Sequence, residues 1–493
     1  MKATYSAALS TVLLPLIAAK NGSNPLVESG KLQELMTEKD LISTLQRLND
    51  IADSNGGNRA FGYPGYAASV DYIFDEISKL DGFAVWKQNF PALFTNTTAA
   101  DITIGNESLR TVALTYTPST PEEGISAKVI LGPEGEDACF IDNYKNIDVE
   151  GNIILVERGL CPDQTTFAGK VKPAAAAGAA AVILYNSDIS KLTAGSLSNP
   201  SSEYVPSALI DQEPGQALKA RIEGGGDVEA HVTIIQLIEE RITQNVFAET
   251  KGGDAQNVVM FGSHLDSVPA GAGINDDGSG TSLNLQLARG LSNFSTQLKI
   301  RFGWWGAEEN GLWGSRFYVN NLTRFEIDDI LLYINFDMVS RGFWGVFDGD
   351  GDEVGPGGAP GSDVIESLFV EHLADQGLEI APVGLTGGTD YVPFMDIINK
   401  PVGGLFTGAA PAQDSCYHQA CDNIENVVPE ILTTNAKAAA HVLSVLAIDG
   451  RELIPKTPAN GTSGPFKASM DPASPFVSSN ISAHSKLCDH DII

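Results

Sequence analysis

Three apolar segments of this chain are followed directly by side chains that bind divalent cations or move protons. The segment MFGSHLDS delivers His264 and Asp266, RFGWWGAEE delivers Glu308 and Glu309, and YINFDM delivers Asp337. Functional groups of α/β proteins gather just past the carboxyl ends of strands, so these side chains are expected to meet at one edge of a sheet. Imidazole and carboxylate ligands without thiolates suit a catalytic zinc ion that keeps an open coordination position.

A glycine-rich turn and a short cysteine loop extend this set. Asp276 and Asp277 lie in GAGINDDGSG (271–280), and His418 lies in CYHQAC, between Cys416 and Cys421. Each motif alone has an ordinary structural explanation, because an HxD pair, adjacent glutamates or a helix N-cap occur without any metal. Several carboxylates and two histidines at strand ends are costly unless a cation neutralises them. Their combination therefore predicts a metal site.

The elements that must position these residues alternate between strand and helix from Asn245 onward. This alternation predicts an α/β fold with a mixed, largely parallel sheet flanked by helices. Thr37 is a candidate N-cap within the first of the expected helices. The helices indicated by apolar spacing cover residues 32–48, 66–80, 280–291 and 429–446.

The middle of the chain has a different pattern. After a proline-punctuated linker, a strand (151–161), an alanine-rich helix (170–180) and a second strand (181–186) follow closely. Strand, helix and strand over so short a stretch form a compact unit of their own. The segment GNIILVERGLCPDQTTFAGKVKPAAAAGAAAVILYN resembles the protease-associated (PA) domain, which implies a non-catalytic module inserted into a peptidase.

The joint pattern of SHLDSV, GINDDGSG, AEE, NFDM and CYHQACD resembles the zinc aminopeptidases of peptidase family M28. The resemblance covers residues 41–446 and is closest to the fungal secreted or vacuolar type with an inserted PA domain, so it implies the zinc-peptidase fold. It implies two zinc ions bridged by Asp276, the first held also by His264 and Asp337 and the second by Glu309 and His418. Two such cations share and acidify a water and polarise a scissile carbonyl.

The same resemblance assigns roles to residues around the ions. Glu308 is expected to be the general base, and Glu308 and Asp337 to recognise the free N-terminal amine of a peptide. Tyr417 is expected to donate a hydrogen bond to the oxyanion. Asp266 is expected to be the carboxylate that orients the imidazole of His264.

A substrate pocket follows by the same resemblance. Met338, Phe406 and Tyr417 are expected to line it, and such an apolar lining favours an N-terminal Leu, Phe or Met. One position departs from the family. Many relatives carry G-R-S-D-Y, with an arginine that contacts substrate, where this chain has GGTDY (387–391) and thus Gly388.

The resulting organisation has four parts. Residues 1–19 are a predicted signal peptide, 20–116 and 236–452 the catalytic domain, 117–235 the PA domain and 453–493 a flexible C-terminal tail. The signal rests on Lys2, the apolar run AALSTVLLPLIAA and the small residues that end it. We therefore expect a secreted protein, with the vacuolar lumen as the alternative destination.

Glycosylation motifs and cysteines fit an oxidising compartment. Cys416 and Cys421 are close enough to close a tight loop, Cys139 and Cys161 a second, and Cys488 is left over. The candidate N-glycosylation sites are Asn21, Asn96, Asn106, Asn293, Asn321, Asn460 and Asn480.

Composition limits the partners. The 493 residues include 31 Lys+Arg and 62 Asp+Glu, a net charge of −31, which disfavours nucleic-acid binding. No internal stretch has about 18 consecutive apolar residues, so no membrane span is expected. We expect a monomer that acts on peptides with a free N-terminus.

Other readings remain open. The turn DGDGDE (348–353) looks like half of a calcium loop, but Ala359 stands where an EF-hand needs glutamate, so a solvated acidic turn is favoured.

Two related enzyme classes are alternatives to an aminopeptidase. Glutaminyl cyclases use one zinc ion and lack a PA insertion, and the related carboxypeptidases usually carry a membrane anchor and a further dimerisation domain. A non-catalytic binding protein of the same fold would have no reason to keep every ligand and the base.

Overall fold

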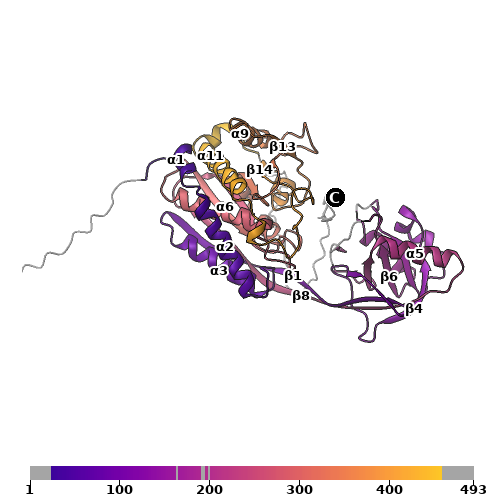
Figure 1. The fold of residues 1–493 in the computed structure, drawn as a ribbon. Helices are drawn as coiled ribbons and strands as arrows, with labels where there is room; N and C mark the ends of the chain where they lie inside the picture. Colours follow the sequence, from indigo (N-terminus) through magenta and orange to yellow (C-terminus); the bar gives the residue numbers. More distant parts are fainter. Residues whose placement is uncertain (1–23, 163–164, 190–194, 198–199, 458–493) are drawn as a thin grey trace, which may run out of the picture.

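The computed structural model describes residues 24–457 apart from 163–164, 190–194 and 198–199. The predicted signal peptide, Cys488 and the sequons at Asn21, Asn460 and Asn480 lie outside the described residues. Figure 1 shows a larger lobe, built from both ends of the chain, and a smaller lobe built from its middle. A pair of long strands runs from one lobe to the other.

The larger lobe contains a mixed sheet in the order β13-β12-β14-β11-β9-β10-β8. Strands β14, β11, β9 and β10 are mutually parallel, whereas β8 and β12 pair antiparallel with their neighbours in this group. The predicted fold class is therefore confirmed. The strands are β8 (Glu229–Thr250), β9 (Asp254–His264), β10 (Leu298–Trp305), β11 (Ile330–Phe336), β12 (Trp344–Phe347), β13 (Ile380–Val383) and β14 (Val402–Leu405).

Helices cover both faces of this sheet because its central strands are apolar on both sides. In β9, Val259 and Phe261 join one buried cluster while Val258 and Met260 join the other, as the two-residue period of a strand requires. The first cluster includes residues of α1 (Ser29–Glu34), α2 (Glu38–Ser54), α3 (Pro64–Ser78), α6 (Gly280–Leu291), α9 (Ser362–Ala374) and α11 (Pro429–Leu453). The second includes residues of α7 (Trp313–Asn320), α8 (Arg324–Asp329) and α10 (Val392–Asp396).

Two helices differ from the sequence-based expectation. The helix expected over 32–48 is two helices, because Thr37 is extended and its hydroxyl accepts the Asp40 N–H (3.2 Å), which starts α2. Helix α11 runs on to Leu453 and is long and apolar enough to cross a membrane by length and composition, but 61% of that apolar window is buried in the fold. Of the expected tail, Ile454 is buried and Thr457 accepts a hydrogen bond from the buried Lys400 amine (3.1 Å).

The smaller lobe has a sheet of its own. Strands β4, β5, β6 and β7 are parallel in that order, and β3 pairs antiparallel with β7. The disulfide Cys139–Cys161 ties two of its loops, as predicted. The elements are β3 (Thr111–Ala113), β4 (Ile125–Leu131), β5 (Ile153–Glu157), α4 (Ala168–Ala176), β6 (Ala181–Tyr185), β7 (Ser207–Ile210) and α5 (Gln212–Glu223).

The connection between the lobes is a two-stranded ribbon. Strand β1 (Phe83–Ile104) pairs antiparallel with β8 from Phe83↔Thr250 to Ile104↔Ala230, and β2 (Glu107–Leu109) folds back on its far end. Near the larger lobe, the Arg241 guanidinium lies 3.5 Å from the centre of the Phe94 ring and donates to the Gly62 carbonyl (2.7 Å). Phe94 belongs to a buried cluster with Ala307, so the ribbon packs against the segment that carries Glu308 and Glu309.

The sequons within the described residues lie at the surface. Asn106, Asn293 and Asn321 are exposed. Asn96 is half-buried on β1, and its Oδ1 accepts a hydrogen bond from the Tyr63 hydroxyl (3.3 Å).

Candidate active site

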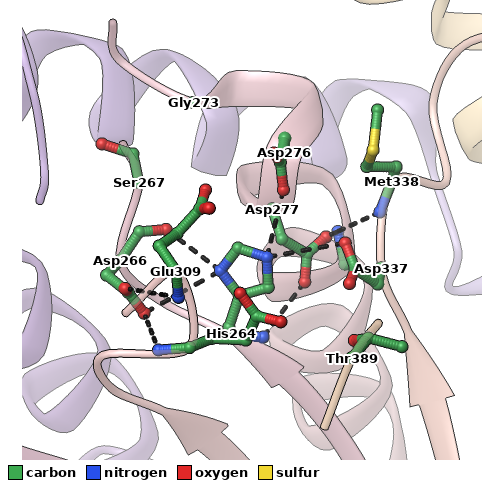
Figure 2. Close-up of polar contacts among 12 residues, drawn as sticks. His264, Asp266, Ser267, Gly273, Asp276, Asp277, Glu309, Asp337, Met338 and Thr389 are labelled. Carbon is green, nitrogen blue, oxygen red and sulfur yellow. Dashed lines mark hydrogen bonds and ion pairs between the residues drawn. The ribbon is translucent and has the colours of Figure 1, made fainter. Parts of the chain in front are cut away.

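The strand ends bring the predicted residues together at the carboxyl edge of the sheet. His264 ends β9, Asp337 follows β11, and Glu308 and Glu309 follow β10, which is parallel to β9 and adjacent to it. Figure 2 shows His264 surrounded by carboxylates, which come from Asp266, Asp276, Asp277, Glu309 and Asp337.

Asp276 lies between the two histidines and divides the site into two halves. Its Oδ1 is 3.1 Å from His264 Nε2, and its Oδ2 is 3.1 Å from His418 Nε2. On the first side, Asp337 Oδ1 is 3.5 Å from His264 Nε2. On the second side, Glu309 Oε2 is 3.0 Å from His418 Nε2. Each half therefore offers one imidazole, one carboxylate of its own and one oxygen of a shared carboxylate.

The electrostatics of this cluster suit cations. In the part of the chain that the structure describes, the buried Glu309 Oε1 receives no hydrogen bond. Burial raises the pKa of Glu309 to about 7. Burial opposes charge on His418, but Glu309 and Asp276 outweigh it and raise the pKa of His418 to about 10. Without a metal ion, the carboxylates of Asp276 and Glu309 are neutralised only by a protonated His418. A divalent cation would neutralise them directly and leave the imidazole uncharged, so these residues fit a metal ion.

Glu308 is a buried carboxyl group beside the two halves. Its side chain is 3% exposed, and burial, followed by the neighbouring charges of Asp390, Glu309 and Asp337, raises its pKa well above the ordinary value. The preceding residue, Ala307, has a positive backbone φ (54°), which is uncommon for a residue other than glycine. A carboxyl group held in this way is suited to accept and return a proton.

Asp266 acts differently from the sequence-based expectation. His264 Nδ1 makes its hydrogen bond to the backbone carbonyl of Asp266 (3.2 Å), and the nearer carboxylate oxygen is 3.9 Å away. The carboxylate instead accepts the backbone N–H groups of Glu308 (3.1 Å) and Glu309 (3.3 Å). Because Asp266 is two positions after His264, both its carbonyl and its carboxylate lie near the imidazole, and the spacing alone did not distinguish these two uses. Asp266 thus positions both the histidine and the two glutamates.

The second aspartate of the NDDGSG turn has a structural role. Asp277 Oδ2 accepts the His264 N–H (3.1 Å), while Oδ1 accepts the N–H groups of Gly280 (2.8 Å) and Met338 (3.1 Å). The Asp276–Asp277 peptide bond is cis. Asp277 therefore joins the end of β9, the start of α6 and the segment after β11, and its carboxylate is already satisfied by backbone donors.

Sequence reasoning missed the residues that hold the cysteine loop in place. Asp422 accepts the N–H groups of Asn275 (2.8 Å) and Asp276 (3.0 Å), and Asp414 accepts from the Asn275 side chain (2.8 Å). The disulfide Cys416–Cys421, predicted from its spacing, closes the loop that carries Tyr417 and His418. The partners of Asp422 are backbone N–H groups and that of Asp414 is a side-chain amide, all more than a hundred residues away, so no local pattern pointed to Asp422 or Asp414.

Asp390, in the GGTDY segment, was also missed. Its carboxyl group is fully buried. Burial, with the charges of Asp266 and Asp337 nearby, raises the pKa of Asp390 to about 7. The charge of this buried carboxyl group contributes to the raised pKa of Glu308.

A cavity of about 80 Å³ opens beside the two halves. The three residues predicted for the substrate pocket, Met338, Phe406 and Tyr417, all line it. Gly388 also lines it, and a Cβ added there would meet no atom within 4 Å. The apolar residues that the sequence did not place here are Phe347, Val383 and Ala409.

The acidic turn 348–352 is held by its own backbone. Asp348 is fully buried and accepts the N–H groups of Gly351 (2.7 Å), Glu353 (3.1 Å) and Val354. The exposed Asp350 and Asp352 have carboxylate oxygens within 4.8 Å of that of Asp348. The carboxylate of Asp348 is thus satisfied without a cation, as expected of an Asx-type turn.

The α/β fold, with paired imidazole and carboxylate groups at the carboxyl edge of its sheet, is that of an enzyme with a candidate metal site. Residues 245–443 match peptidase family M28, and residues 125–218 match the PA domain. The chain is 36% identical over 454 residues to a probable leucine aminopeptidase 2 of Arthroderma benhamiae, covering 88% of this chain and 89% of that protein. The leucine aminopeptidase 2 of Trichophyton rubrum is similar to the same extent.

Solved structures agree. The aminopeptidase from Aneurinibacillus sp. strain AM-1 superposes with a TM-score of 0.72 at 26% identity, covering 85% of this chain and 96% of that one. A zinc aminopeptidase from Bacillus subtilis superposes with a TM-score of 0.64 at 25% identity, covering 86% and 98%. The chain belongs to peptidase family M28 and is a zinc aminopeptidase with a PA domain.

Proposed function

We propose that this enzyme binds two zinc ions and removes apolar residues, leucine above all, from the N-terminus of extracellular peptides. The observation that carries the proposal is the placement of Asp276, whose two oxygens face His264 and His418 separately. His264, Asp276 and Asp337 would hold one ion, and Asp276, Glu309 and His418 the other. Zinc bound there supplies Lewis acidity, which acidifies water and polarises a carbonyl group.

The chain's own groups perform the proton transfers. Glu308 is not among the ligands, and its carboxylate would take a proton from the attacking water and deliver it to the departing amine. The Tyr417 hydroxyl would donate a hydrogen bond to the developing oxyanion. Burial, followed by the charges of Asp276 and Glu309, raises the pKa of Tyr417 well above 10, so its phenol stays protonated as a donor.

Selection of a free N-terminus follows from the local charge. Glu308 and Asp337 present carboxylates to the amine of the first residue, and such a site accepts an ammonium group but penalises an uncharged amide. An internal peptide bond places an amide at this position. The site therefore favours exopeptidase cleavage.

Hydrolysis of Leu-p-nitroanilide tests this function, with acetyl-Leu-p-nitroanilide as the matched substrate. The free substrate should be cleaved, and acetylation should abolish cleavage because it removes the positive charge. Activity should disappear after chelation and return with zinc. Cleavage of the acetylated substrate at a comparable rate would contradict the exopeptidase assignment. Loss of zinc with no loss of activity would contradict the metal assignment.

The preference for the first side chain depends on the cavity lined by Met338, Phe347 and Phe406. Leucine, phenylalanine and methionine p-nitroanilides should have kcat/KM values at least about 10-fold above alanine, since even one additional methylene in an apolar pocket is worth ~1–3 kcal/mol. Met338→Lys should reduce this preference, while Leu453→Lys, at an exposed position at the end of α11, should leave it unchanged. A preference of the wild-type enzyme for lysine or arginine substrates would overturn this assignment.

The cellular setting completes the proposal. The predicted signal peptide, the two disulfides and the exposed sequons Asn106, Asn293 and Asn321 support a secreted glycoprotein, with the vacuolar lumen as the alternative. A monomeric state and the boundaries of the PA insertion (117–235) are part of the same proposal. Calcium at the 348–352 turn is not, because the carboxylate of Asp348 is satisfied by backbone donors.

A further inference from the structure

Arg59 is a fully buried cation beside the active site, with no place in the roles assigned above. It lies between α2 and α3, and its side chain is 0% exposed. No ion pair found in the described part of the chain involves it. A buried guanidinium is costly unless its donors are satisfied, so its partners indicate what it does.

All of its hydrogen bonds go to one loop. Nε donates to the Ala272 carbonyl (2.8 Å), Nη2 to the Gly273 carbonyl (2.5 Å) and Nη1 to the Leu265 carbonyl. Its backbone N–H donates to Ser267 Oγ (3.0 Å). Residues 265–273 connect His264, at the end of β9, to the turn that carries Asp276. Arg59 therefore holds both ends of the segment between two proposed ligands.

The turn is shaped to receive the guanidinium. Gly273 has a positive φ of 62°, and a Cβ there would come within 2.4 Å of the Asp276 carbonyl and 3.3 Å of Arg59 Nη2. A side chain at this position would therefore push the turn away from the arginine. The planar fork of five donors reaches three carbonyls at once, which the single ammonium of lysine does not.

The charge of Arg59 also suits this place. The carboxylates of Asp266, Asp277, Asp422 and Asp276 all lie near enough to favour the charged guanidinium, although burial lowers its pKa overall. Arg59 thus adds a fixed positive charge to a cluster of acidic groups without contacting the proposed zinc ligands through its side chain. It attracts these carboxylates into one place, while its own side-chain donors go to backbone carbonyls and not to the carboxylate oxygens.

We propose that Arg59 is a positioning residue for the zinc site, which fixes loop 265–273 and through it the separation of His264, Asp266 and Asp276. This inference rests on the metal site of the proposed function. Residues that orient metal ligands from outside the coordination sphere typically contribute 10- to 100-fold to metal affinity. Without Arg59, loop 265–273 could shift, and His264 and Asp276 would no longer be held in the positions that bind zinc. The affinity for zinc would then fall.

The test compares Arg59→Lys with Arg301→Lys in the full chain. Arg301 is a matched control, because it is a largely buried arginine whose partners, Glu249 and Tyr318, lie outside the site. The dissociation constant for zinc is measured by competition with a chromophoric chelator, and the melting temperature with and without zinc. Arg59→Lys should weaken zinc binding about 10- to 100-fold and reduce the gain in melting temperature on zinc addition, whereas Arg301→Lys should stay within about twofold of wild type.

Steady-state kinetics add a second readout. At saturating zinc, Arg59→Lys should lower kcat for Leu-p-nitroanilide more than it changes KM, because the apolar pocket is untouched. If Arg59→Lys gives no folded protein, Ser267→Ala replaces it. It removes the hydroxyl that accepts the Arg59 N–H and that donates to the Gly271 carbonyl (3.1 Å) within the same loop, so a several-fold weaker zinc affinity is expected.

The outcomes separate this inference from the proposed function. Zinc affinity within about twofold of wild type in Arg59→Lys, or in Ser267→Ala where that variant is used, would overturn the role of Arg59 while leaving the proposed site intact. Equal weakening in Arg59→Lys and Arg301→Lys would also overturn it, as a general effect on stability. A wild-type chain that binds no zinc would overturn both proposals.

Discussion

Glu308→Gln is expected to lower kcat for Leu-p-nitroanilide by about 10²- to 10⁴-fold, the usual contribution of a positioned general base. Glutamine has the same shape as glutamate but accepts no proton at neutral pH. Glu308 is not one of the proposed ligands, so the variant should retain the zinc content of the wild type. Burial raises the pKa of Glu308 in the metal-free chain, which means that its charge destabilises that state. Glutamine should therefore leave the metal-free protein at least as stable.

The matched control is the neighbouring residue. Glu309→Gln makes the same chemical change one position along the chain, but it alters a carboxylate that lies 3.0 Å from His418 Nε2. This variant should lose zinc as well as activity. Activity of Glu308→Gln within tenfold of wild type would exclude Glu308 as the base, and zinc loss in that variant would make it a ligand.

Asp276→Asn is expected to reduce bound zinc from about two ions per chain to fewer than one and to abolish hydrolysis. An asparagine has one acceptor oxygen in place of two. It therefore cannot supply one ligand oxygen beside His264 and a second beside His418. Zinc content is measured by mass spectrometry after dialysis against a buffered free-zinc concentration. The melting temperature with zinc should approach that of the metal-free wild type.

Asp348→Asn is the control for the second experiment. Asp348 is also a buried aspartate, but it accepts backbone N–H groups in the acidic turn. This variant should lose stability and keep its zinc and activity. Two zinc ions per chain in Asp276→Asn would show that the aspartate does not bridge. Two ions lost from Asp348→Asn would show that zinc content follows general stability.

The strand ends of the site could be predicted because their signals are local. An apolar segment followed by a histidine or carboxylate places that side chain at a known edge of a parallel sheet. The helices 280–291 and 429–446 were predicted for a similar reason, since apolar spacing is read over neighbouring residues. Helix α11 extends to Leu453 because its final turns still pack on the core, a contact that spacing did not reveal.

What could not be predicted depends on partners distant in the sequence. Arg59 donates to carbonyls more than two hundred residues away, and Asp422 accepts backbone N–H groups from the NDDGSG turn. Backbone groups are identical at every position, so the sequence gives no sign of which of them a buried polar side chain will meet. The expected contact between the Asp266 carboxylate and the His264 imidazole illustrates the same difficulty. The carbonyl and the carboxylate of Asp266 both lie near the imidazole, and the hydrogen bond goes to the carbonyl.

The ribbon of β1 and β8 has a consequence for how the chain reaches its native state. Ile104 and Ala230 are paired neighbours at its far end, so the whole smaller lobe is topologically the turn of a long β-hairpin. Closing an unstructured loop of that length has an entropic cost that grows with the number of residues in it. A smaller lobe that folds first places its own two ends side by side and removes most of that cost. The inserted lobe would then act as a folding template, which aligns β1 and β8 before the catalytic sheet assembles upon β8.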